Sequence, residues 1–271
     1  MMRISDTFAG LKEAGRTGFV AYITAGDPDL ETTRNLVLEL ERRGVDIIEL
    51  GVPFSDPLAD GPVNQESAQR ALRHEASVSH IMDMVADLRS ETDIPIVLFT
   101  YYNPVHRYGL ERFGDHARTA GVNGALVLDL PPEESGDYRQ VMAARGLDTI
   151  YLLTPTSREN RIRLISSCTT GFVYYVSRTG VTGERTRLAD TVRPKVAQIR
   201  ACTPKPIAVG FGVSQPEHVQ EIANYADAVV VGSAIVRRIG EEGGEPDLVA
   251  RIGAFVDTLV RPLRRTPNGS G

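Results

Sequence analysis

The residue with the clearest chemical signal is Glu49, a carboxylate near the end of the apolar run Val45–Leu50. It lies two residues after Ile47, so both side chains point to the same face of a strand. A carboxylate partly desolvated among apolar side chains has a raised pKa, which makes it a usable proton donor or base. Pairing of Glu49 with a lysine or arginine is the alternative, because buried acids usually need a partner.

A second acid, Asp60, follows in the segment Gly51–Val63. Prolines stiffen this segment, so it is not a loose connector. Asp60 also precedes a Gly-Pro pair, and it could therefore simply cap a helix. Turn formation is the simpler interpretation of two further acids, Asp27 and Asp56.

Two glycine-rich turns occur late in the chain, each before a helical pattern. The first is Val209–Ser214, which contains Gly212, and the second is Val231–Ile235, which contains Gly232 and Ser233. Backbone N–H groups and the positive end of a helix favour an anion, and glycine lets the backbone approach it closely. The two turns predict a site for a phosphate monoester, with ordinary tight turns as the alternative.

Other candidates give weaker signals. The polar segment Ser177–Arg187 is either a lid that excludes water or a surface loop. None of the five histidines follows a strand candidate, which argues against a zinc site. The two cysteines, Cys168 and Cys202, have no metal-ligand spacing, so we expect reduced structural thiols.

Eight short apolar runs alternate with helical patterns and would position these residues. The runs are Gly18–Thr24, Val45–Leu50, Ile94–Tyr101, Gly124–Leu128, Thr149–Leu153, Phe172–Val176, Pro206–Val209 and Ala228–Val231. Nearly continuous apolar runs are typical of parallel strands covered on both faces. Eight such units predict an α/β fold, a closed (β/α)8 TIM barrel, rather than an open doubly wound sheet. In this barrel, catalytic residues lie at the carboxyl ends of the strands.

We expect one barrel domain over residues 1–263, with extra short helices in the loops, and a disordered tail over 264–271. The helical patterns include 133–145 and 248–263. The composition, with 42% hydrophobic and 24% charged residues, is that of a globular chain. No apolar run approaches the ~18 residues that span a bilayer. The net charge of −5 argues against nucleic acid as a partner, and we expect a cytoplasmic protein.

Six segments, in this order, closely resemble one family, the tryptophan synthase α subunits, which are indole-3-glycerol-phosphate lyases. The matching segments are Gly26–Pro28, Glu49–Pro62, Asp129–Pro131, Ser177–Gly183, Gly210–Ser214 and Val231–Ser233. The resemblance covers residues 4–263, and its 49–62 segment is far more specific than any glycine motif. It implies retro-aldol cleavage of indole-3-glycerol phosphate into indole and glyceraldehyde 3-phosphate.

The resemblance also implies roles for individual residues. Glu49 matches the acid/base residue that protonates the indole ring carbon and helps to take the proton from the adjacent hydroxyl. Asp60 matches the residue that holds the indole N–H and stabilises the positive charge created by ring protonation. The other matches are Tyr174 and the lid residue Thr182 in catalysis, Gly183, Gly212, Gly232 and Ser233 at the phosphate, and Tyr22, Phe99, Leu126, Leu152 and Phe211 around the indole. Tyr22 and Phe99 depart from the phenylalanine and leucine often found in the family.

The family further implies a partner, the pyridoxal-phosphate-dependent β subunit of an α2β2 complex, which receives indole through a tunnel. Pro53, Asp56, Tyr101 and Asn103 lie in loops where we expect this contact. No cofactor is expected in this chain, because pyridoxal phosphate belongs to the partner.

Three other functions remain as alternatives. The chain could be a stand-alone lyase that releases free indole, or a catalytically inactive activator of a β subunit. The presence of both acids argues against inactivity. A sugar-phosphate isomerase is the third alternative, which the absence of strand-end histidines and lysines argues against.

Overall fold

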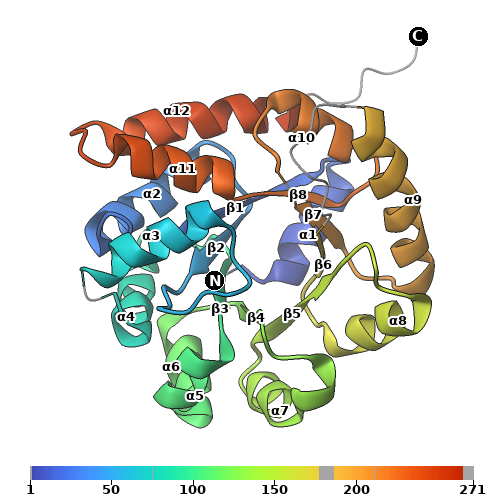
Figure 1. The fold of residues 1–271 in the computed structure, drawn as a ribbon, viewed down its shortest axis with the longest axis horizontal. Helices are drawn as coiled ribbons and strands as arrows, with labels where there is room; N and C mark the ends of the chain where they lie inside the picture. Colours follow the sequence, from blue (N-terminus) through green and yellow to red (C-terminus); the bar gives the residue numbers. More distant parts are fainter. Residues whose placement is uncertain (1, 75, 177–185, 211, 265–271) are drawn as a thin grey trace.

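The eight expected strands are all present, and they are parallel and closed into a barrel in chain order (Figure 1). The computed structural model describes residues 2–74, 76–176, 186–210 and 212–264, and for residues 186–190 the backbone only. The strands are β1 Gly18–Thr24, β2 Ile47–Gly51, β3 Ile96–Thr100, β4 Gly124–Val127, β5 Asp148–Leu153, β6 Val173–Val176, β7 Ile207–Gly210 and β8 Ala228–Val231. Pairing of β1 with β8, in the register Gly18↔Ala228, closes the ring. The barrel prediction is confirmed, and the open-sheet alternative is wrong.

The helices lie around the barrel, except α1, which lies behind the strands (Figure 1). They are α1 Ile4–Glu13, α2 Leu30–Arg42, α3 Pro62–Leu72, α4 Val78–Leu88, α5 Tyr102–Tyr108, α6 Leu110–Ala120, α7 Gly136–Ala144, α8 Glu159–Cys168, α9 Thr186–Cys202, α10 Pro216–Ile222, α11 Ser233–Glu242 and α12 Leu248–Val260. Two 3₁₀ turns are η1 Pro132–Glu134 and η2 Arg261–Arg264. Among the described residues, no helix is long and apolar enough to cross a membrane.

Two predicted helices are each divided in the structure. The pattern over 133–145 becomes η1 and α7, because Ser135 leaves helical geometry and its hydroxyl donates to the Pro132 carbonyl. The pattern over 248–263 becomes α12 and η2, and Pro262, which has no N–H to donate, lies within η2.

Buried apolar side chains of the described residues form two cores, one inside the barrel and one between the barrel and its helices. Helix α1 contributes Ile4, Phe8 and Leu11 to the inner core. Figure 1 shows α1 behind the strands, at the end opposite the segment that follows β2. The N-terminal end of the barrel is therefore covered by α1, and the carboxyl ends of the strands carry the candidate site.

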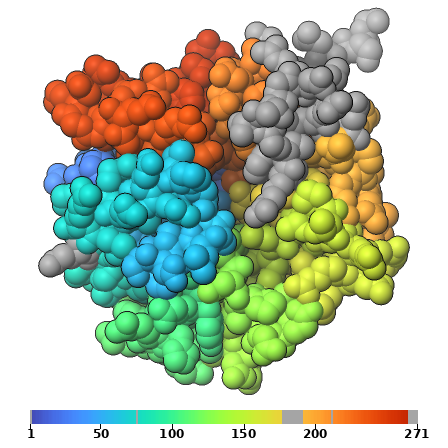
Figure 2. Space-filling view, viewed as in Figure 1, coloured from blue at the N-terminus to red at the C-terminus, as the bar shows by residue number. Residues whose placement is uncertain are grey.

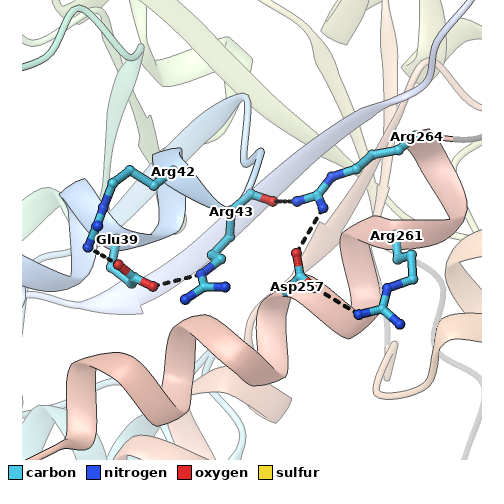
Figure 3. A network of polar contacts seen from close by, with 6 residues as sticks. All are labelled: Glu39, Arg42, Arg43, Asp257, Arg261 and Arg264. Carbon is cyan, nitrogen blue, oxygen red and sulfur yellow. Dashed lines mark hydrogen bonds and ion pairs between the residues drawn. The ribbon is translucent and has the colours of Figure 1, made fainter.

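A polar network joins α2 to the C-terminal elements (Figure 3). Glu39 of α2 accepts hydrogen bonds from Arg42 and from Arg43, whose Nε lies 2.7 Å from Glu39 Oε1. Across the interface, Asp257 of α12 accepts from Arg261 and Arg264 at 3.1 and 2.8 Å.

Arg264, expected to begin the disordered tail, instead belongs to η2. Its guanidinium bonds the Asp257 carboxylate and the Arg43 carbonyl, which holds it against α2. The remaining tail residues, 265–271, lie outside the described residues.

Candidate active site

Glu49 is fully buried inside the barrel without a polar partner. Its side chain is 0% exposed, and neither carboxylate oxygen has a hydrogen-bond partner among the described residues. Burial alone raises the pKa of Glu49 to about 8. Among the described residues, no lysine or arginine pairs with Glu49, so the ion-pair alternative is wrong for this part of the chain. At neutral pH this group holds a proton that it can give up, as an acid/base catalyst requires.

Strand register places Glu49 at this position. Glu49 is level with Tyr22 on β1 and with Val97 on β3. Val97 and Ile47 belong to the inner core, so Glu49 points into the barrel as the spacing predicts. The apolar lining explains why the carboxyl is desolvated.

Two tyrosines approach Glu49 from other strands. The pKa values of the Tyr22 and Tyr174 hydroxyls are raised by burial and, in addition, by the negative charge of Glu49. Tyr174 packs against the inner core, whereas its neighbour Tyr175 belongs to the outer core. Of the two adjacent tyrosines on β6, Tyr174 is therefore the one beside Glu49.

Asp60 is held by a tyrosine rather than by a helix end. The Tyr101 hydroxyl donates to Asp60 Oδ2 at 2.9 Å, and the same hydroxyl accepts from the Ala59 N–H at 3.0 Å. Burial raises the pKa of Asp60, and hydrogen bonds from Tyr101 and Asn64 partly offset the rise. The N-cap of α3 is Gly61, and no side chain caps that helix. Asp60 thus does not have the capping role that its position before Gly-Pro allows.

The expected indole pocket is lined by apolar and aromatic groups from several strands. The Tyr22 and Phe99 rings meet edge to face with centroids 5.0 Å apart. Leu126 is buried in the inner core, and Phe99 and Leu152 are half-buried against it. Phe211 lies outside the described residues. These side chains suit a flat apolar ring beside the two acids.

The glycine turns after β7 and β8 have the backbone freedom that an anion site needs. Gly212 has φ +54°, and a β-carbon there would meet nothing within 4 Å. Gly232 is the N-cap of α11, no side chain caps this helix, and Ser233 is exposed at its first position. Among the described residues, no side chain bonds the first N–H groups of α11, which can therefore donate hydrogen bonds to an anion. Thr182 and Gly183, both in the expected lid, lie outside the described residues.

The four residues expected at a partner surface differ in exposure. Asp56 and Asn103 are exposed, but Pro53 and Tyr101 are buried and present little surface to another chain. The role of Tyr101 toward Asp60 was not predicted, since the two are 41 residues apart in sequence. The signal in the sequence was the position of Tyr101 at the end of the expected strand run Ile94–Tyr101. Figure 2 shows the face of the molecule at the carboxyl ends of the strands. On this face, the segment after β2 (blue) lies beside the segments drawn in green.

Asp27, read as a turn residue, has a larger structural role. It is 2% exposed, and its two oxygens accept from Arg70 of α3 at 2.8 Å each. No group of three or more potential metal ligands was found among the residues with defined placement. Cys168 and Cys202 are both free thiols.

Among the described residues, this (β/α)8 barrel combines a buried acid that has no polar partner, a second acid in the segment after β2 and an uncapped helix end after β8. Such a combination is typical of barrel enzymes that act on phosphorylated substrates. Comparison with known proteins identifies the family. The family model described as tryptophan synthase alpha chain matches residues 8–259. The chain belongs to the tryptophan synthase alpha chain family, whose members are lyases that cleave indole-3-glycerol phosphate.

Individual relatives agree along nearly the whole chain. The tryptophan synthase alpha chain of Geotalea uraniireducens is 52% identical over 96% of this chain and 97% of its own length. A crystal structure of the alpha chain from Legionella pneumophila has a TM-score of 0.90 and 34% identity, covering 99% of each chain. A structure concerning mutual activation of the α2β2 complex of Pyrococcus furiosus has a TM-score of 0.85 and 39% identity, covering 91% of this chain and 98% of that one.

Proposed function

We propose that this chain cleaves indole-3-glycerol phosphate by a retro-aldol reaction at the mouth of the barrel, with Glu49 as the acid/base residue. The observation that carries the proposal is the Glu49 carboxyl, which is fully buried, lacks a polar partner among the described residues and has a pKa of about 8. It is protonated near neutral pH, yet close enough to its pKa to exchange the proton.

The proposed step conserves its protons. Glu49 gives a proton to the indole ring carbon that bears the glycerol chain, and positive charge develops on the ring. The bond from that carbon to the glycerol chain then breaks, and its electron pair stays with the indole. The adjacent hydroxyl loses its proton, becomes the aldehyde oxygen of glyceraldehyde 3-phosphate, and that proton restores Glu49.

Asp60 stabilises the charged ring in this proposal. Its carboxylate would accept the indole N–H, where the positive charge is partly located. The hydrogen bond from Tyr101 supports this role, because it fixes one oxygen of the Asp60 carboxylate in place. We assign the substrate phosphate to Gly212 after β7, to Gly232 and Ser233 at the start of α11, and to Gly183. The lid residue Thr182 is assigned to catalysis.

The test is incubation of the purified chain with indole-3-glycerol phosphate and detection of indole and glyceraldehyde 3-phosphate. We expect the two products in equal amounts. Absence of both products, with and without an added β subunit, would show that the proposed activity is wrong.

We also propose that the chain works with a β subunit in an α2β2 complex, to which it passes indole. The exposed Asp56 and Asn103, and Leu58, which is 84% exposed in the same loop as Asp56, support a contact on this face. Adding β subunit should form a complex on gel filtration and raise the rate of indole release. A high rate for the isolated chain, with no complex, would instead favour the stand-alone lyase.

Tryptophan synthase alpha chains carry no cofactor. Pyridoxal phosphate is accordingly assigned to the β subunit. We further infer a cytoplasmic location, which the biosynthetic role of the family and the two free thiols support. Cell fractionation with an antibody against the chain tests this location.

A further inference from the structure

Tyr22 extends from the phosphate turn to the neighbourhood of Glu49. At one end, its β-carbon lies 3.2 Å from the point that a β-carbon on Gly232 would occupy. At the other end, its hydroxyl fills the space that a side chain on Gly51 would need. Gly51 is two residues after Glu49 on β2, so a side chain at position 51 would point to the same face of the strand as the Glu49 side chain. The Tyr22 hydroxyl is therefore in the layer directly above the Glu49 carboxyl.

A chain of buried hydroxyls orients the Tyr22 proton. Ser67 Oγ donates to the Asn64 carbonyl at 2.8 Å and lies 2.6 Å from Thr24 Oγ1. Since the Ser67 hydrogen is already used, Thr24 donates to Ser67, and Thr24 Oγ1 is left to accept from Tyr22. That last contact is 3.4 Å, longer than an ordinary O–H···O bond, so the Tyr22 hydrogen is only weakly held.

Three groups that carry or can carry negative charge act on the Tyr22 hydroxyl. Glu49 of β2, Asp60 of the following loop and the Tyr101 hydroxyl after β3 all raise the pKa of Tyr22, in addition to burial. Burial, and in addition the charge of Glu49, also raise the pKa of Tyr174 on β6. Tyr22 is thus a neutral donor among groups that carry or can carry negative charge.

Resting on the proposed function, we propose that Tyr22 is a positioning residue for proton transfer. Its hydroxyl turns from Thr24 to the Glu49 carboxylate once Glu49 has given up its proton, and it returns when Glu49 is protonated again. The hydrogen bond stabilises a buried carboxylate that otherwise has no partner among the described residues, and so it favours release of the proton to the substrate.

The Tyr22→Phe variant removes only this hydroxyl. We expect kcat for indole release to fall about tenfold, which is the effect of one hydrogen bond to a charged group, and KM to change less than twofold. We also expect the pKa of Glu49, measured from the pH profile of kcat, to rise. Tyr175→Phe is the matched control, because that ring lies on the opposite face of β6, in the outer core, and it should leave both quantities unchanged.

A direct titration makes the test independent of activity. The carboxyl ¹³C signal of Glu49, assigned with Glu49→Gln, gives its pKa in the wild-type chain and in each variant. Thr24→Val removes the competing acceptor and should leave this pKa unchanged or lower it, opposite to Tyr22→Phe.

The outcomes separate the two proposals. Wild-type kcat and an unchanged Glu49 pKa in Tyr22→Phe overturn the role of Tyr22. If Tyr22→Phe does not fold, a raised Glu49 pKa in Thr24→Val overturns it instead. Loss of indole release in the wild-type chain refutes the proposed function, and the NMR titration then still decides whether Tyr22 bonds Glu49.

Discussion

Two buried glutamates in this protein have opposite surroundings. Glu39 of α2 is 3% exposed, and Arg42 and Arg43 bond its two oxygens (Figure 3). Glu49 of β2 is 0% exposed and has no hydrogen-bond partner among the described residues. The first belongs to a network that joins α2 to α12, and the second lies at the mouth of the barrel.

The difference comes from the neighbouring backbone. On α2, residues three and four positions apart face each other, so the two arginines reach Glu39 from the next turn. Gly253 of α12 leaves room for the carboxyl, since a β-carbon there would overlap it. Inside the barrel, the described neighbours of Glu49 are apolar or tyrosine side chains, so a negative charge on its carboxyl would be uncompensated. Burial by itself therefore does not distinguish the two acids, whereas the lack of a polar partner among the described residues does, and it is the reason for the role that we propose for Glu49.

The largest expected effect is the loss of activity in Glu49→Gln. We expect indole release to fall about a thousandfold, within the range for removing a general acid. The free energy of unfolding should not fall, because the carboxyl has no polar partner to lose in the part of the chain that the structure describes. Enzyme assay and urea unfolding measure the two quantities. Activity within tenfold of wild type would contradict the role of Glu49.

The next effect is on the pH dependence of stability. Burial raises the pKa of Glu49 from the ordinary value of 4.5 to about 8 in the folded chain, whereas the unfolded chain keeps the ordinary value. Between these two pH values, the folded chain therefore binds more protons than the unfolded chain. Raising the pH through this window therefore favours unfolding, by about 1.4 kcal/mol per pKa unit and a few kcal/mol in total.

This pH effect is measured as the difference between wild type and Glu49→Gln, which cancels the other titrating groups. Urea unfolding from pH 4 to 9 should show the wild type losing stability relative to the variant as the pH rises. A flat difference would mean that Glu49 ionises normally.

A smaller effect, on stability alone, is expected for Glu39→Gln. We expect a loss of about 1–2 kcal/mol, less than for a fully buried ion pair, because Arg42 and Arg43 are 74% and 38% exposed and regain water. Indole release should stay within twofold of wild type. Arg42→Gln is the control, with a loss below about 0.5 kcal/mol. A large fall in activity would place Glu39 in the catalytic machinery and remove the contrast with Glu49.

The smallest expected effect is that of Tyr101→Phe. Asp60 loses its hydroxyl partner, so its pKa should rise further and indole release should fall about fivefold. Tyr102→Phe, the same change one residue later, should have no effect on the rate. Equal rates for Tyr101→Phe and wild type would show that Asp60 is positioned without Tyr101.

Much of the fold could be predicted because strand and helix periodicity are local. Strand β1 was expected at Gly18–Thr24 and has those bounds, and Glu49 points inward as its distance from Ile47 requires. The bounds of the helix after β4 could not be predicted from periodicity. Ser135 interrupts this helix, and its hydroxyl donates a hydrogen bond to the Pro132 carbonyl. The Tyr101–Asp60 contact could not be predicted either, because it joins the ends of two separate strand-loop units.

By itself, the sequence determined the order of strands and helices, the face on which Glu49 lies and the glycine turns after β7 and β8, since each depends on a few neighbouring residues. Only the tertiary structure decided which acids have partners. Asp27 is paired with Arg70 and Glu39 with two arginines, while Glu49 has none among the described residues. The physical reason is that the pKa of an acid depends on every group packed around it, and closing the barrel brings together residues from all parts of the chain.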